Sequence, residues 1–132
     1  MNKNSILNPA LAMAAIIGLV GCASTSKPTT SGEPGVAFNQ PVAKTQRAAV
    51  DALTVIGCDI KKQEPTYVEG HRPLKMGLVV GSGNETVKVT LTAISPQKTS
   101  VNVKTEKSFV GGAGQKDWSQ QVLAEMTKSL GQ

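Results

Sequence analysis

The residues best suited to chemistry in this sequence are two cysteines, Cys22 and Cys58, and a single histidine, His71. A deprotonated thiol is a nucleophile, and an imidazole can act as a base or a metal ligand. Cys22 follows an uncharged apolar run directly, whereas Cys58 lies within the stretch VIGCDI. An apolar neighbourhood indicates a buried thiol of low reactivity. We therefore expect chemistry first at Cys22.

The segment before Cys22 has the organisation of an export signal. Lys3 gives it a positive start, and the uncharged run from Ala10 to Val20 is about half of the ~20 residues that span a bilayer. The order LVGC at residues 19–22 resembles a bacterial lipobox, in which the cysteine thiolate attacks a lipid donor and cleavage falls before the cysteine. An ordinary signal peptide with a coincidental cysteine is the alternative.

Lipidation at Cys22 would place the protein on a membrane. Two or more acyl chains, palmitate among them, anchor a protein stably, whereas one chain binds only marginally. Ala23 follows the cysteine. In Gram-negative lipoproteins an aspartate at that position tends to mean inner-membrane retention, so Ala23 favours an outer-membrane anchor with the domain in the periplasm. The inner membrane and the cell surface are the alternatives.

The rest of the chain divides into a tether and one domain. Residues 23–40 are rich in Ser, Thr, Pro and Gly and nearly lack large apolar side chains, which is typical of disorder. We predict a signal peptide at residues 1–21, the lipidated cysteine and a disordered tether at 22–40, and a globular α+β domain at 41–132. That length suits a single domain.

Hydrophobic periodicity predicts the elements of this domain. Helical spacing covers residues 42–56, with a stop at Gly57, and again residues 117–130. Strands are expected at residues 58–63, 66–72, 86–93 and 99–104, while residues 73–84 fit either a strand or a loop. The predicted fold is helix-strand-strand-strand-strand-helix, a four-stranded antiparallel sheet with two helices packed on one face.

The last two strands alternate without error, so their valines and Leu91 should face the helices. A turn at Pro96 and Gln97 would place Glu85 opposite Ser108. The glycine-rich segments at residues 81–85 and 111–118 would then meet beside the amino terminus of the last helix, whose free N–H groups attract anions. The candidate recognition residues are Gly83, Glu85, Gly112, Gly114, Lys116 and Trp118. Burial of Trp118 in the core is the alternative.

The composition argues against several classes of function. The formal net charge is +5, with 14 basic and 9 acidic residues, but the lysines are scattered and the chain has four aromatic residues, so we expect no nucleic-acid partner. His71 has no second histidine for a metal site or a hydrolase triad, and a surface position is expected for it. The run GGAGQK lacks the glycine and hydroxyl of a phosphate-binding loop. We expect no enzyme activity, no catalytic residue, no metal and no cofactor.

The segment ETVKVTLTAISPQKTSVNVKTEKSFVGGAGQKDWSQQVLAEMTKSL at residues 85–130 resembles a family of small bacterial lipoproteins known as a domain of unknown function. Residues 48–58 are similar to that family's first helix and its glycine stop. The resemblance implies the order lipobox, spacer, helix, two hairpins, helix. It implies no assigned activity and no catalytic residue.

Together these features predict a membrane-anchored periplasmic lipoprotein that acts as a non-catalytic binding or accessory module of the cell envelope. Its partners would be the membrane, through the lipid, and an envelope protein. A purely structural envelope lipoprotein is the second interpretation, and a hydrolase of envelope polymers is the third.

Overall fold

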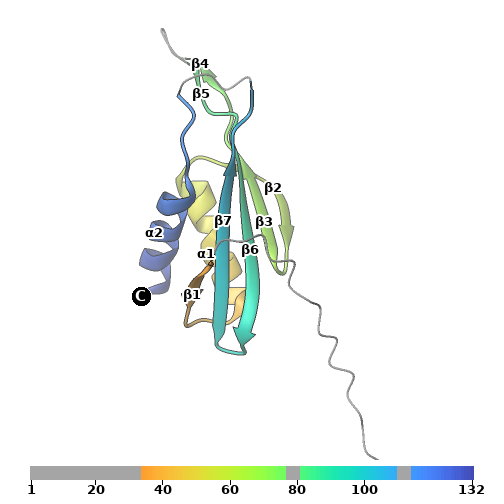
Figure 1. Ribbon diagram of the computed structural model, residues 1–132, viewed down its shortest axis with the longest axis vertical. Coiled ribbons are helices and arrows are strands. Elements are labelled where there is room, and N and C mark those ends of the chain that lie inside the picture. The colour runs from red at the N-terminus through yellow and green to blue at the C-terminus, as the bar shows by residue number, and fades with distance from the viewer. Residues whose placement is uncertain (1–33, 77–80, 110–113) are drawn as a thin grey trace, which may run out of the picture.

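Five antiparallel strands form a sheet, and both helices cover one of its faces (Figure 1). The computed structural model describes residues 34–76, 81–109 and 114–132. The strands lie in the order β1-β7-β6-β3-β2. Their bounds are Val36–Phe38 for β1, Asp59–Glu64 for β2, Tyr67–His71 for β3, Thr86–Ser95 for β6 and Lys98–Glu106 for β7. The helices are α1 (Val42–Val55) and α2 (Ser119–Leu130), so the predicted α+β class is confirmed.

The two helices form where the apolar spacing predicted them. In α1 the buried side chains are Thr45, Ala48, Ala49, Ala52 and Leu53. Helix α1 ends before Gly57, whose φ of +83° is a conformation that glycine adopts readily. Helix α2 begins at Ser119, two residues after the predicted start, and packs against α1 and β7.

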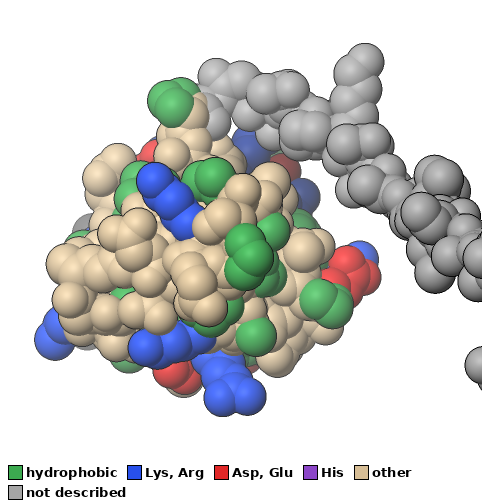
Figure 2. Space-filling model, turned by 90° about the horizontal axis from the view of Figure 1, so that it is seen from below, with side chains coloured by type: hydrophobic (Ala, Val, Ile, Leu, Met, Phe, Trp, Pro, Cys, Tyr) green, Lys and Arg blue, Asp and Glu red, His purple; other side chains and the backbone are tan. Residues whose placement is uncertain are grey.

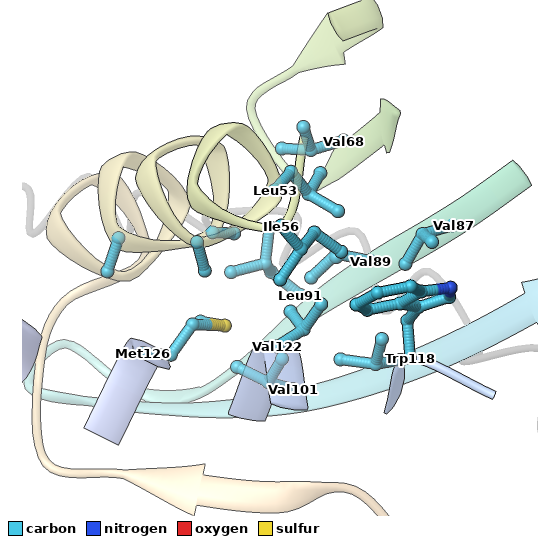
Figure 3. Close-up of a cluster of buried hydrophobic side chains, with 14 of the residues drawn as sticks. Leu53, Ile56, Val68, Val87, Val89, Leu91, Val101, Trp118, Val122 and Met126 are labelled. Atoms are coloured by element: carbon cyan, nitrogen blue, oxygen red, sulfur yellow. The ribbon is translucent and has the colours of Figure 1, made fainter. Parts of the chain in front are cut away.

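The core lies between the helices and the inward face of β6 and β7. The alternating residues of these strands are buried as predicted: Val87, Val89, Leu91, Val101 and Val103. Figure 3 shows four of these strand residues, Val87, Val89, Leu91 and Val101, on the same side as Leu53 and Ile56 at the end of α1 and Val122 and Met126 of α2. Period-two patterning therefore identified the core face of this hairpin correctly.

The register of that hairpin differs by one residue from the prediction. Ser95 pairs with Lys98 around the predicted turn, but the register shifts between Ala93 and Ser95. Beyond this irregularity Thr86 lies opposite Glu106, so the expected opposition of Glu85 and Ser108 is wrong. Because of this shift, valine lies opposite valine on the buried face. A regular series of paired residues that continued from the turn without a bulge would not place the valines opposite each other.

A fifth strand lies within the segment that was expected to be a disordered tether. Strand β1 pairs with β7, and Phe38, opposite Thr99, is only 2% exposed. The Thr99 hydroxyl donates a hydrogen bond to the Gln40 carbonyl at 2.8 Å and fixes the chain that leaves the strand. The predicted four-stranded sheet therefore lacked one strand, and the ordered domain includes residues 34–40.

The structure also shows the first hairpin and the strands within the segment for which both a strand and a loop were considered. Strands β2 and β3 pair as predicted, with the turn at residues 65–66. The segment at residues 73–84 contains two short strands, β4 (Lys75–Met76) and β5 (Gly81–Ser82), which form a separate two-stranded sheet at one end of the molecule (Figure 1). Residues 77–80 lie outside the described residues.

Replacing Phe38 tests whether β1 belongs to the folded domain. Phe38→Ala should lower the free energy of unfolding by about 3–5 kcal/mol, because a buried phenylalanine is lost and a cavity remains. The matched control Val36→Ala removes a side chain that is 43% exposed and should cost less than about 1 kcal/mol. Urea unfolding followed by circular dichroism measures both values. Equal losses in the two variants would contradict the packing of β1.

Candidate functional site

A buried carboxylate, that of Glu85, lies where the sheet passes into the loops. Its side chain is 0% exposed. Its Oε1 accepts hydrogen bonds from the Trp118 indole N–H at 3.2 Å and from the Lys116 backbone N–H at 3.3 Å. Its Oε2 lies 3.3 Å from Nη1 of Arg72 in an ion pair. A buried charge is costly unless it is paired and hydrogen-bonded, and here both conditions are met.

The local backbone explains why Glu85 points inward. Glu85 is two residues before Val87, so it continues the buried face of β6 beyond the end of that strand. The chain reaches it through two positive φ angles, +110° at Gly83 and +65° at Asn84. A Cβ atom at Gly83 would lie 2.2 Å from the carbonyl oxygen of Pro73, so only glycine fits this close approach.

Arg72 connects the Glu85 carboxylate to the C-terminal end of α1. Its Nε donates to the Ile56 carbonyl at 3.0 Å, and its guanidinium carbon lies 3.8 Å from the centroid of the Trp118 ring. Its backbone N–H also donates to the Glu85 carbonyl at 2.9 Å. One arginine therefore holds the end of β3, the end of α1 and the segment before α2 in a single arrangement.

Trp118 is part of the core, as the alternative interpretation had it. It is 8% exposed and belongs to the same cluster as Val87 and Val122 (Figure 3). Its backbone N–H donates to the Thr105 hydroxyl at 2.9 Å, which attaches the segment before α2 to β7. Its ring also contacts Nζ of Lys116, 3.8 Å from the centroid. The ring of Trp118 therefore packs in the core beneath the loops and is not exposed for contact with a ligand.

The electrostatics of Glu85 follow from these contacts. Burial by itself raises the pKa of the carboxyl group, but the hydrogen bonds from Trp118 and from backbone N–H groups, together with the Arg72 charge, outweigh it and lower the pKa below 4.5. Glu85 is therefore ionised at neutral pH. Among the described residues, no buried side-chain nitrogen or oxygen lacks a hydrogen-bond partner.

The two loops converge above this network, as predicted. The Gln115 amide donates to the Gly83 carbonyl at 3.1 Å, and the Asn84 amide donates to the Ser108 hydroxyl. Gly114 is exposed, Gly83 is buried, and Gly112 lies outside the described residues. Among the exposed side chains on these segments, we call Leu74, Lys75, Lys107, Phe109 and Lys116 the loop surface, and Pro73 and Asp117 are exposed beside it.

The uncovered face of the sheet carries polar side chains that bond to one another. His71 Nδ1 lies 3.4 Å from the Thr86 hydroxyl, so the histidine is a hydrogen-bonded surface residue. The Tyr67 hydroxyl donates to Glu69 at 2.5 Å, and partial burial and this carboxylate raise the pKa of Tyr67 to about 12. Within the described ranges, no group of three or more His, Cys, Asp or Glu residues could hold a metal ion.

Arg72 was not identified from the sequence, although it has the most contacts to other segments in this network. A signal was present, because Glu85 extends the period-two series of Val87 and Val89 and so occupies an inward position. An inward carboxylate requires a cation, and Arg72 directly follows β3, the strand that pairs with β6. Cys22 and the predicted signal peptide lie outside the described residues.

Comparison with protein-family models and with curated proteins finds no match to this chain. In the part of the chain that the structure describes, neither helix has the length and apolar character needed to cross a membrane.

Glu85→Gln should lower the free energy of unfolding by about 3–5 kcal/mol at pH 7, because it leaves the Arg72 charge without its buried partner. The control Glu106→Gln breaks a half-exposed ion pair with Lys88 and should change stability little. Urea unfolding gives both values. Equal stability of Glu85→Gln and the parent chain would show that the carboxylate is not held as described.

The lowered pKa of Glu85 also predicts that the effect of Glu85→Gln on stability depends on pH. Because the folded pKa of Glu85 is lowered, its stabilisation is present above the unfolded pKa near 4.5 and is lost as the pH falls through the folded value. The stability difference between the parent chain and Glu85→Gln should therefore shrink below about pH 4.5. A difference that stays constant between pH 7 and pH 3 would contradict this.

Cys58 should be unreactive in the native chain. Burial raises the pKa of its thiol to about 11, despite the nearby Arg72 charge. Only about one molecule in a thousand then carries a thiolate at pH 8, against roughly a quarter in the unfolded chain. In a Cys22→Ser chain, reaction with a thiol reagent should be at least roughly a hundredfold slower in buffer than in urea. Equal rates would contradict the burial of Cys58.

Proposed function

We propose that this chain is a lipid-anchored module of the bacterial cell envelope that binds an envelope component through the loop surface and has no catalytic activity of its own. The lipid is attached at Cys22 of the LVGC sequence, and Ala23 favours the outer membrane as the location. The α+β domain then lies in the periplasm. A tether before Pro34 connects it to the anchor.

The observation that carries this proposal is the full exposure of Phe109 at the end of the molecule where β4, β5 and the segment before α2 meet. Its side chain is 105% exposed, and Leu74 on the neighbouring segment is also exposed. Exposed aromatic residues are frequent in binding surfaces, where their burial provides much of the affinity. The network of Arg72, Glu85 and Trp118 fixes the neighbouring segments before β6 and α2, so those segments would need little ordering on binding.

Two measurements in cells test this proposal. Labelled palmitate should be incorporated into the parent chain and not into Cys22→Ala, because the thiol is the point of attachment. A photoreactive phenylalanine analogue in place of Phe109 should give a crosslinked product in the envelope. The same analogue in place of Ile94, which is 55% exposed beside the turn at the other end of the sheet, is the matched control.

The outcomes separate the two parts of the proposal. Absence of label on the parent chain would overturn the lipid anchor. Equal crosslinking from positions 109 and 94, or none from either, would overturn the loop surface as the binding site. A defined product from position 109 alone supports the proposal and identifies the envelope component.

A further inference from the structure

The loop surface combines exposed lysines with exposed apolar side chains. Lys75, Lys107 and Lys116 are exposed on the three segments that meet there. Glu85 is buried and paired with Arg72. Two carboxylates are accessible beside these segments: Asp117 accepts a hydrogen bond from the Ser119 backbone N–H at 2.8 Å, and Glu106, at the end of β7, is paired with Lys88 at 2.7 Å. The loop surface therefore presents more positive than negative charge to its surroundings.

We propose that the loop surface binds the anionic headgroups of the membrane that holds the lipid anchor, with Phe109 inserted at the headgroup boundary. This inference rests on the proposed function, because it assumes that Cys22 carries lipid. Lysines are attracted to anionic lipids, and an aromatic side chain gains by leaving water at the interface. The two types of contact together fit a membrane surface better than either would alone.

The path of the chain permits this orientation. Strand β1 runs antiparallel to β7, with Val36 beside Val101, so the preceding residue Pro34 lies towards the loop end of β7. Pro34 lines a cavity of about 260 Å³ together with Val103 and Asp117. The chain therefore enters the domain beside the middle of β7, between the turn and the loop surface (Figure 1).

The distance available to the tether is also sufficient. A chain between Cys22 and Pro34 can span at most about 40 Å. Phe109 follows Val103 by six residues, so it lies at most about 20 Å from the level at which the chain enters. The anchor can therefore reach a bilayer that is in contact with Phe109 without unfolding β1.

The opposite end of the molecule provides a matched comparison. Figure 2 views that end, where hydrophobic side chains form small separate areas. Ile94 and Lys98 flank the turn there, and both are exposed. They reproduce the pairing of one apolar residue with one lysine that Phe109 and Lys107 provide on the loop surface.

The test uses the mature chain at residues 22–132 with Cys22→Ser, so that the domain itself and not the lipid is measured. The probes are vesicles of phosphatidylethanolamine and phosphatidylglycerol, and vesicles of phosphatidylcholine alone. Co-sedimentation at increasing lipid concentration should show binding to the first and not to the second. Binding should also weaken as salt is raised, because the lysines act through charge.

The variant Lys107→Gln/Phe109→Ala should bind at least tenfold more weakly, and Ile94→Ala/Lys98→Gln should bind like the parent chain. Both pairs are exposed, and urea unfolding verifies that each variant is folded. Failure of the parent chain to bind anionic vesicles, or an equal loss in the two variants, would overturn the inference.

These outcomes are distinct from failure of the proposed function. A Cys22 that takes up palmitate in a chain that does not bind anionic vesicles would overturn only the membrane contact. A crosslink from position 109 to one protein, and not to phospholipid, would also overturn the membrane contact while supporting the proposed function. Absence of palmitate at Cys22 would overturn the anchor on which both depend.

Discussion

The buried charge of Glu85 is the constraint on which the arrangement of this end of the molecule depends. An ionised carboxylate without water must be surrounded by donors, and here they come from two separate places in the chain. Arg72 follows β3, whereas Lys116 and Trp118 precede α2. Movement of either segment would leave the charge unpaired. The carboxylate therefore holds together segments that have no regular secondary structure.

Such a network contributes more to specificity than to net stability. The cost of removing a carboxylate and a guanidinium from water cancels much of their attraction, so a pair of apolar residues could stabilise the fold equally well. A pair of apolar residues in place of the ion pair would not fix the path of the backbone through Gly83 and Asn84, whose positive φ angles bring the chain to Glu85. The ion pair is therefore best understood as a device for positioning the loops.

The regular elements could be predicted from the sequence because local periodicity decides them. Valines alternating through β6 and β7 and apolar residues at helical spacing in α1 report directly which face is buried. Strand β1 could not be predicted in this way. It has one buried residue, Phe38, and its pairing partner Thr99 is far away in the sequence. The composition of its neighbours indicated disorder, and a tertiary contact overrode that preference.

The candidate site was predictable in place but not in composition. The positions of the two loops follow from the topology of the hairpin, and Gly83 and Lys116 do lie at the same end. The period-two series indicated that Glu85 faces inward, but its pairing with Arg72 depends on how the end of β3 lies beside β6, which the sequence does not reveal. The one-residue register shift between Ala93 and Ser95 also could not be predicted from the sequence. It is determined by the packing of valines on the buried face and not by the residues of the turn.

Strand β1 also connects the fold to the proposed function. By pairing with β7 it takes residues 36–38 out of the predicted tether, which shortens the maximum reach between Cys22 and the domain from about 60 Å to about 40 Å. If Cys22 carries lipid as proposed, a shorter tether would restrict the domain to the neighbourhood of that anchor. Because β1 brings the chain in beside the middle of β7, the loop surface would still be within reach of a membrane that holds the proposed anchor. Burial of Phe38 and the limited reach of the proposed tether are in this respect two consequences of the same pairing.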